Sequence, residues 1–238
     1  MFAAWVYRLF GMPPPEAAPP VAPDIEPIDV PSPFSVEVPK EVIAMPMSYP
    51  PAFVDAVSYV LDHERGFVND PKDPGGATNM GITYKTLARW YDVSPKSIAP
   101  DDVKNMSRDE AIEIYHAMYW DAVRADKLPP ALAYAAFDFA VNSGPVRAVK
   151  ELQKLIGTTA DGLIGGHTLR RLAAVTDKAD LVNKYADARL AFMRRIKHPK
   201  TKASLWARFG RGWSRRVEDV RRRSLRHVPV GRNGGGSW

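Results

Sequence analysis

The sequence predicts a mainly α protein: a helical domain around one buried central helix, with a small hairpin and loop lobe, preceded by an extended proline-rich arm. Residues 131–142 (ALAYAAFDFAVN) are apolar nearly all round, which is typical of a helix buried on most sides. Strand patterns are scarce and confined to about residues 67–84. Thirteen of the 22 prolines lie within residues 13–51, where they oppose helix and favour the polyproline II conformation.

The composition of the 238 residues limits the classes of function. Hydrophobic residues make up 45% of the chain, which is enough for a packed core. There is no cysteine, and this excludes disulfides, thiol nucleophiles and cysteine-ligated metals. The five histidines are scattered without an HExxH spacing, so we expect neither a zinc site nor any other cofactor.

The first twelve residues, MFAAWVYRLFGM, are apolar but too short to span a bilayer as a helix. Arg8 interrupts the apolar run, so the order of a secretory signal is missing. Residues 1–12 either anchor the chain on a membrane or a partner protein, or pack on their own domain. Residues 13–51 are interpreted as a semi-rigid linker or arm.

A helix that ends in a glutamate is predicted from about residue 50. Glu64 shares one helix face with four apolar residues at three- and four-residue steps, and Gly66 then marks the helix end. Apolar neighbours and the negative end of the helix dipole disfavour the charged carboxylate, so we expect a raised pKa for Glu64. Such a group donates a proton near neutral pH. The four apolar residues are Phe53, Val57, Val60 and Leu61.

The next loop places two further polar groups after Glu64, Asp73 and Thr78, in the spacing E-x8-D-x4-T. Cleavage of an acetal needs an acid for the leaving oxygen and a second group that orients or deprotonates water. Asp73 is the candidate for the second group, and the Thr78 hydroxyl is a candidate to hold the water. Carboxyl groups about 6.5–9.5 Å apart would predict inversion of the anomeric centre. The alternative interpretation is a solvated charge followed by ordinary turn residues.

Caps and helix breakers predict the remaining helices. Thr83 is expected to cap a helix over 84–91, and Ser107 with Glu110 forms a capping box that opens a helix to about residue 125. Further helices are predicted over residues 146–156, from 168, over 179–196 and over 203–226. The predicted division of the chain has five parts: a short apolar segment (1–12), the proline-rich arm (13–51), a domain that contains Glu64 and the central helix (52–156), a second helical region (157–200), and a basic helix with a flexible tail (201–238).

Residues 63–83 (HERGFVNDPKDPGGATNMGIT) resemble the signature of glycoside hydrolase family 108, which reads approximately E-GG-Y followed by DP-x-DPGG-x-T-x-x-GIT. The resemblance covers about residues 52–200. It implies a lysozyme-like fold and the activity of a phage or bacterial N-acetylmuramidase. Further matching elements are Tyr119-Trp120, residues 138–144 (DFAVNSG) and residues 152–169, which are similar to the small peptidoglycan-binding region usual in that family.

The resemblance implies that Glu64 is the catalytic acid, that Asp73 positions water, and that Thr78 assists. In phage-type lysozymes the comparable spacing is E-x8-D-x5-T, one residue longer before the threonine. Two positions depart from the family pattern. Arg65 stands where glycine is usual and would lower the pKa of Glu64, and Phe67 replaces a usual tyrosine.

Sugar sites combine aromatic faces with amide and carboxylate groups. Asn142 is a better candidate for a substrate contact than Tyr119 or Trp120, because it lies at the C-terminal end of the buried central helix. Core packing is the alternative for Tyr119 and Trp120, and for Asp138 we expect a structural hydrogen bond to a backbone N–H or a nearby arginine. The expected substrate contacts are Phe67, Asp70, Tyr84, Tyr119 and Asn142.

The net charge of +6 is unevenly distributed, with a net −4 over residues 1–51 and a net +12 over residues 194–238. Residues 194–232 therefore favour a polyanionic partner, either an anionic envelope polymer or a membrane. A plain solvated helix face is an equal alternative. Nucleic acid ranks behind both, because no base-reading motif accompanies the arginines.

The expected function is hydrolysis of the β-1,4 bond between N-acetylmuramic acid and N-acetylglucosamine in bacterial peptidoglycan, by an endolysin or a virion-associated lysozyme. The alternatives are a lytic transglycosylase and a phage tail or baseplate structural protein with a wall-binding, lysozyme-like domain. Residues 1–51 would contact the tail or baseplate proteins. The expected location is the host cytoplasm and then the periplasm and cell wall at lysis, or the tail of the virion.

Overall fold

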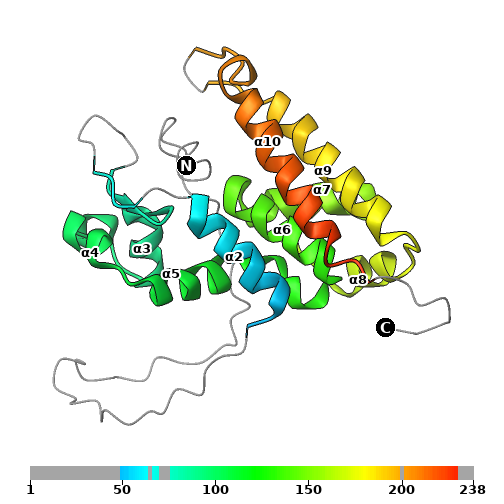
Figure 1. Ribbon diagram of the computed structural model, residues 1–238, viewed down its shortest axis with the longest axis horizontal. Coiled ribbons are helices and arrows are strands. Elements are labelled where there is room, and N and C mark those ends of the chain that lie inside the picture. Colours follow the sequence, from blue (N-terminus) through cyan, green and yellow to red (C-terminus); the bar gives the residue numbers. More distant parts are fainter. Residues whose placement is uncertain (1–48, 64–65, 70–75, 199–200, 230–238) are drawn as a thin grey trace, which may run out of the picture.

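The structure is a computed structural model that describes residues 49–63, 66–69, 76–198 and 201–229 (Figure 1). Most of the predicted arm lies outside these residues. No helix in the described ranges is long and apolar enough to cross a membrane. The elements are α2 (Pro51–His63), β1 (Thr78–Asn79), β2 (Ile82–Thr83), α3 (Tyr84–Trp90), η1 (Pro95–Ser97), α4 (Pro100–Asn105), α5 (Arg108–Tyr115), η2 (His116–Trp120), η3 (Asp121–Val123), η4 (Ala125–Lys127), α6 (Pro130–Ser143), α7 (Pro145–Leu155), α8 (Gly166–Ala173), α9 (Lys178–Arg194) and α10 (Trp206–Leu225).

Helix α6 is the centre of the molecule. All its residues from Ala131 to Asn142 are buried, because its side chains are apolar on nearly every face. Helices α2, α7, α9 and α10 pack around it, as Figure 1 shows. The mainly α fold around one buried helix is therefore confirmed.

A two-stranded hairpin and three short helices form a smaller lobe beside α2. Strands β1 and β2 are antiparallel, with Thr78 opposite Thr83, and Val68 bridges to Thr78 on the other side. Met80 and Gly81 both have positive φ, as a tight two-residue hairpin turn requires. The Thr83 hydroxyl accepts a hydrogen bond from the Thr86 N–H and caps α3, as predicted.

The helix that was predicted to run to about residue 125 is interrupted. Ser107 caps α5 as expected, but α5 ends at Tyr115, and a π-helical turn (η2) and two 3-10 turns (η3 and η4) follow. Arg124 adopts the left-handed conformation, and its guanidinium donates to the Ile164 carbonyl oxygen at 2.8 Å. The continuous helix was predicted from the residues near position 124, and these give no sign of a partner 40 residues further along the chain.

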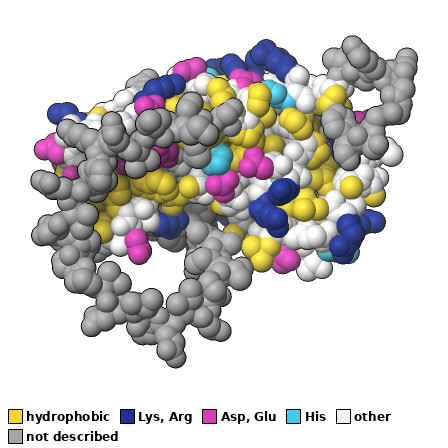
Figure 2. Space-filling model, turned by 90° about the horizontal axis from the view of Figure 1, so that it is seen from below, with side chains coloured by type: hydrophobic (Ala, Val, Ile, Leu, Met, Phe, Trp, Pro, Cys, Tyr) yellow, Lys and Arg dark blue, Asp and Glu magenta, His cyan; other side chains and the backbone are white. Residues whose placement is uncertain are grey.

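Helices α9 and α10 form a hairpin that runs along α6 and projects beyond it (Figure 1). The backbone of Lys197 bridges to that of Ser204 where the hairpin turns. Figure 2 views the molecule from below, away from the projecting end, and shows acidic and basic side chains intermixed with hydrophobic ones.

Candidate active site

The C-terminal ends of α2 and α6 lie side by side. Burial and the nearby carboxylates of Asp138 and Asp55 raise the pKa of Tyr134, and burial and Asp138 raise the pKa of Tyr59. His227 contacts both Asp55 on α2 and the ring of Tyr134 on α6. One turn further along both helices, Arg216 pairs with Asp138 and lies 5.7 Å from the centre of the Tyr59 ring. Both helices run in the same direction (Figure 1), and Asn142 lies in the last turn of α6.

Asn142 carries a buried donor without a partner. The side chain is 2% exposed, and its Oδ1 accepts a hydrogen bond from the Ser143 hydroxyl at 3.1 Å. Its Nδ2 group has no hydrogen-bond partner among the described residues. Leaving such a group unsatisfied costs about 1–3 kcal/mol, so it requires a functional or structural explanation.

The hairpin lobe places Tyr84 against the end of the glycine-rich loop. Gly76 has a φ of +63°, and a Cβ there would lie 2.7 Å from Cε1 of the Tyr84 ring. The Tyr84 N–H also donates to the Ala77 carbonyl oxygen at 3.0 Å. Both the backbone conformation and the neighbouring ring therefore require glycine at position 76.

Thr78 and Phe67 belong to the same lobe. Thr78 is 4% exposed, and its backbone pairs with Val68 on one side and Thr83 on the other. Its hydroxyl has only a long contact, 3.5 Å, to the Gly76 carbonyl oxygen. Phe67 is half-buried and packs on the core next to Val68. The structure thus brings Phe67, Thr78 and Tyr84 together.

Tyr119 and Trp120 are adjacent on η2 but have different surroundings. Trp120 is fully buried against Phe53 and Phe137, so its interpretation as a core residue is confirmed. Tyr119 is half-buried and lies near Thr86 and Arg89 on α3. Burial raises its pKa, and the nearby cation Arg89 opposes that change.

Three predicted residues, Glu64, Asp70 and Asp73, lie outside the described residues, as does Arg65. The chain places Glu64 directly after His63, the last residue of α2. His63 is held there by a hydrogen bond between its Nδ1 and the Tyr59 carbonyl oxygen at 2.7 Å. In the sequence, Glu64 therefore lies between the end of α2 at His63 and the strand bridge at Val68.

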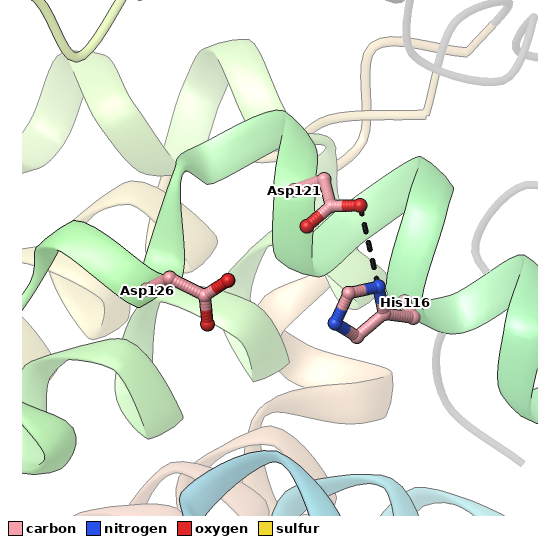
Figure 3. A group of neighbouring side chains, drawn as sticks. All are labelled: His116, Asp121 and Asp126. Carbon is pink, nitrogen blue, oxygen red and sulfur yellow. Dashed lines mark ion pairs between the residues drawn. The ribbon is translucent and has the colours of Figure 1, made fainter. Parts of the chain in front are cut away.

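One group of described residues has the composition of a metal site, and Figure 3 shows it: His116, Asp121 and Asp126. His116 Nδ1 lies 3.2 Å from Asp121, and Asp126 accepts the indole N–H of Trp120 at 2.7 Å. Burial raises the pKa of Asp121, His116 lowers it, and Asp126 raises it further. Each member therefore already has a protein partner that explains its position.

This group sits at the opposite end of α2 from the predicted acid, because the His116 ring packs on Phe53. Sequence reasoning did not single it out, although the regular spacing H-x4-D-x4-D was a visible signal. A cavity of about 600 Å³, whose lining includes Asp126, lies between the start of α6, α8 and the end of α10. None of the predicted site residues lines that cavity.

Comparisons with known proteins give two consecutive family matches. A model described as glycosyl hydrolase 108 matches residues 57–144, and a model described as a predicted peptidoglycan domain matches residues 147–218. The structure of Brucella abortus SagA is similar, with 40% identity and a TM-score of 0.65, over 75% of this chain and 97% of that one. A comparison with curated proteins found no match. The first matched segment contains every site residue predicted above.

Proposed function

Because the chain belongs to the glycosyl hydrolase 108 family and is a peptidoglycan hydrolase, we propose that it cleaves the β-1,4 bond between N-acetylmuramic acid and N-acetylglucosamine. The observation that carries the proposal is the end of α2 at His63, the residue directly before Glu64 in the sequence. Helix α2 packs on α6, whose last turn contains Asn142. A carboxylic acid at the negative end of a helix favours its protonated form, as a general acid requires.

In the proposed reaction, Glu64 protonates the glycosidic oxygen as the bond to the anomeric carbon breaks. Asp73 positions the attacking water or stabilises the positive charge that develops on the sugar ring. Thr78 holds the attacking water with its hydroxyl. The pairing of its backbone on both sides fixes the residue in the hairpin, and its hydroxyl is available because it has only one long contact among the described residues. The water proton passes to a carboxylate, and both sugar fragments leave with hydroxyl groups.

Substrate contacts are proposed on both sides of Glu64. The Nδ2 group of Asn142, which no described residue satisfies, would donate to a hydroxyl or acetamido oxygen of the sugar. The half-buried rings of Phe67, Tyr84 and Tyr119 offer apolar faces to sugar rings. Asp70 would accept a hydrogen bond from a sugar hydroxyl.

The proposal is tested by the release of reducing ends from purified peptidoglycan. We expect Glu64→Gln to lower the rate by about a hundredfold or more, which is the scale of general acid catalysis. The matched control is Asp62→Asn, which removes an exposed carboxylate from the same helix end. Near-normal activity of Glu64→Gln would overturn the assignment of the acid.

Mass spectrometry of the released fragments separates hydrolysis from transglycosylation. Hydrolysis adds one water to each cleaved bond, whereas a lytic transglycosylase forms an anhydro sugar without that water. We expect the hydrated product, because a second carboxylate, Asp73, is present to activate water. An anhydro product from the wild-type enzyme would assign the transglycosylase reaction instead.

The place of action is part of the proposal. We propose that the enzyme reaches the host wall from the host cytoplasm at lysis, or that residues 1–51 attach it to a phage tail or baseplate. Counting copies of the chain in purified phage particles decides between the two. A fixed number per particle supports the virion enzyme, and absence from particles supports the free endolysin.

A further inference from the structure

Seven exposed cations cluster around the turn of the α9–α10 hairpin, which we call the hairpin tip. No acidic residue occurs between Asp187 and Glu218 in the sequence. None of the seven forms an ion pair with any residue in the described part of the chain. They are Arg194, Arg195, Lys197, Lys202, Arg208, Arg211 and Arg215.

The other half of α10 behaves differently. Arg221 pairs with Asp187, Arg222 pairs with Asp219 at 2.7 Å, and Arg223 pairs with Asp55 at 3.3 Å. The cations there form ion pairs with carboxylates of the same chain. The seven cations of the tip lie close together in the sequence around the hairpin turn and have no such acidic partner among the described residues, so the tip rather than the whole basic end is the candidate interaction surface.

Aromatic side chains pack closely at the hairpin tip. The Trp206 ring packs so closely on Gly210 that a Cβ there would lie 2.7 Å from the ring. Trp206 also contacts the buried Trp213, and the Arg194 guanidinium lies 5.1 Å from the centre of the Trp206 ring. The aromatic groups are therefore used in packing, and the cations are held outside them on a fixed frame.

The hairpin tip exposes cations but no large hydrophobic side chain among the described residues. The large hydrophobic side chains that are exposed in the described residues all lie outside it: Val54, Val68, Tyr91, Val93, Leu155 and Leu163. Deep insertion into hydrocarbon is therefore disfavoured. Contact with a layer of negative headgroups matches the charge and needs no apolar anchor.

The shape of the tip favours a flat partner. Figure 1 shows that the hairpin projects from the body of the molecule, and the described pockets are lined by residues outside the tip. A polymer strand is bound best by a groove, whereas a protruding end reaches a planar surface without shape complementarity. We propose that the hairpin tip docks this enzyme on the phosphate headgroups of an anionic membrane.

The fold then gives the docked enzyme an orientation. Arg223 and His227, at the far end of α10, both contact Asp55 near the start of α2, so α2 and α10 run in opposite directions. The end of α2 that precedes Glu64 therefore points the same way as the tip. Docking would direct the proposed active site towards glycan strands close to the membrane.

Vesicle cosedimentation of the full chain tests this proposal without peptidoglycan, so its outcome is independent of the hydrolysis assay. Phosphatidylcholine vesicles with and without phosphatidylglycerol are compared at low and high salt. We expect binding that depends on phosphatidylglycerol and weakens with salt. Changing Lys197, Lys202, Arg208 and Arg211 to Gln should weaken binding by about 600-fold, at roughly fivefold for each of the four cations.

The matched control removes the same charge elsewhere, with Gln at four exposed cations that form no ion pair among the described residues: Lys96, Lys104, Arg108 and Arg170. The control should bind as the wild type does, and both variants should keep wild-type circular dichroism and activity on soluble wall fragments. Equal loss in both variants, or salt-independent binding to neutral vesicles, would overturn the proposal. Binding to duplex DNA with no binding to anionic vesicles would assign the tip to nucleic acid instead.

Discussion

Arg216 donates from Nη2 to Oδ2 of Asp138 at 2.7 Å, across 78 residues of chain. Arg189 completes the group with a 2.7 Å contact to Oδ1, and all three side chains are buried. Asp138 lies on α6 in the segment that matches the hydrolase family, whereas both arginines lie in the segment that matches the peptidoglycan domain. A buried ion-pair group therefore joins the two matched segments.

Replacing Asp138 with Asn should destabilise the fold by about 3–5 kcal/mol, because it leaves two buried guanidinium groups without a counter-charge. Urea unfolding measures the change. Asp187→Asn is the matched control, since it removes a more exposed carboxylate that pairs with Arg221. The control should cost less than about 1 kcal/mol. Similar losses in both variants would contradict the importance of burial.

Acid should weaken the protein through the same carboxylate. Burial alone would raise the pKa of Asp138, but the guanidinium groups of Arg216 and Arg189 outweigh burial and lower it from 3.8 to about 2. Between these values the unfolded chain binds the proton and the folded protein does not. The stabilisation is therefore complete above pH 3.8 and is lost as the pH falls towards 2.

Unfolding free energies measured from pH 5 down to pH 2, about the range in which carboxylates titrate, check this dependence. The wild type should lose stability steadily over the lower part of that range. The Asp138→Asn protein should show a shallower slope, because it lacks the shifted group. Parallel slopes in the two proteins would show that other carboxylates cause the acid sensitivity.

Asn142→Ala should separate function from folding. The buried Nδ2 group has no partner among the described residues, and the Ser143 hydroxyl that donates to Oδ1 is partly exposed and can bond to water instead. Removal of the amide should therefore change stability by less than about 1 kcal/mol. If it donates to the sugar, kcat/KM on peptidoglycan should fall at least about tenfold, a loss typical of one hydrogen bond.

Asn79→Ala is the reverse case. Asn79 is also buried, but its Nδ2 donates to the Lys104 carbonyl oxygen at 3.1 Å. Its removal should cost about 1–3 kcal/mol in stability, because that carbonyl loses its partner. A large stability loss in Asn142→Ala with unchanged activity would make Asn142 a structural residue.

Gly76→Ala should disturb the loop that carries Asp73. The added Cβ would meet the Tyr84 ring, and the φ of +63° costs an alanine about 1–2 kcal/mol. We expect a lower melting temperature and lower activity. Gly66→Ala is the control for stability, since its Cβ would meet nothing within 4 Å.

The double variant Gly76→Ala, Tyr84→Ala divides the two causes of that loss. Removing the ring should relieve the steric clash but leave the backbone strain. Stability should therefore recover in part relative to the expected sum of the single changes. Strict additivity would mean that the ring and the glycine do not act on each other.

The sequence by itself determined the features that depend on neighbours along the chain. The all-round apolar pattern of residues 131–142 identified α6, because a helix with no polar face must be buried. Thr83 and Ser107 marked helix starts through their local caps. The family resemblance around Glu64 is likewise a property of a short stretch. The roles of Glu64 and Asp73 and the domain boundaries at 156 and 200 stay predictions.

Only the tertiary structure decided which distant groups meet. Sequence reasoning expected a backbone N–H or an arginine beside Asp138, but only the packing of α9 and α10 on α6 selects Arg189 and Arg216. Likewise, no local pattern predicts that Arg223 on α10 pairs with Asp55 on α2, which lies 168 residues earlier in the chain. The reason is physical: caps and periodicity act within a few residues, whereas the partner of a charge is set by how whole helices pack.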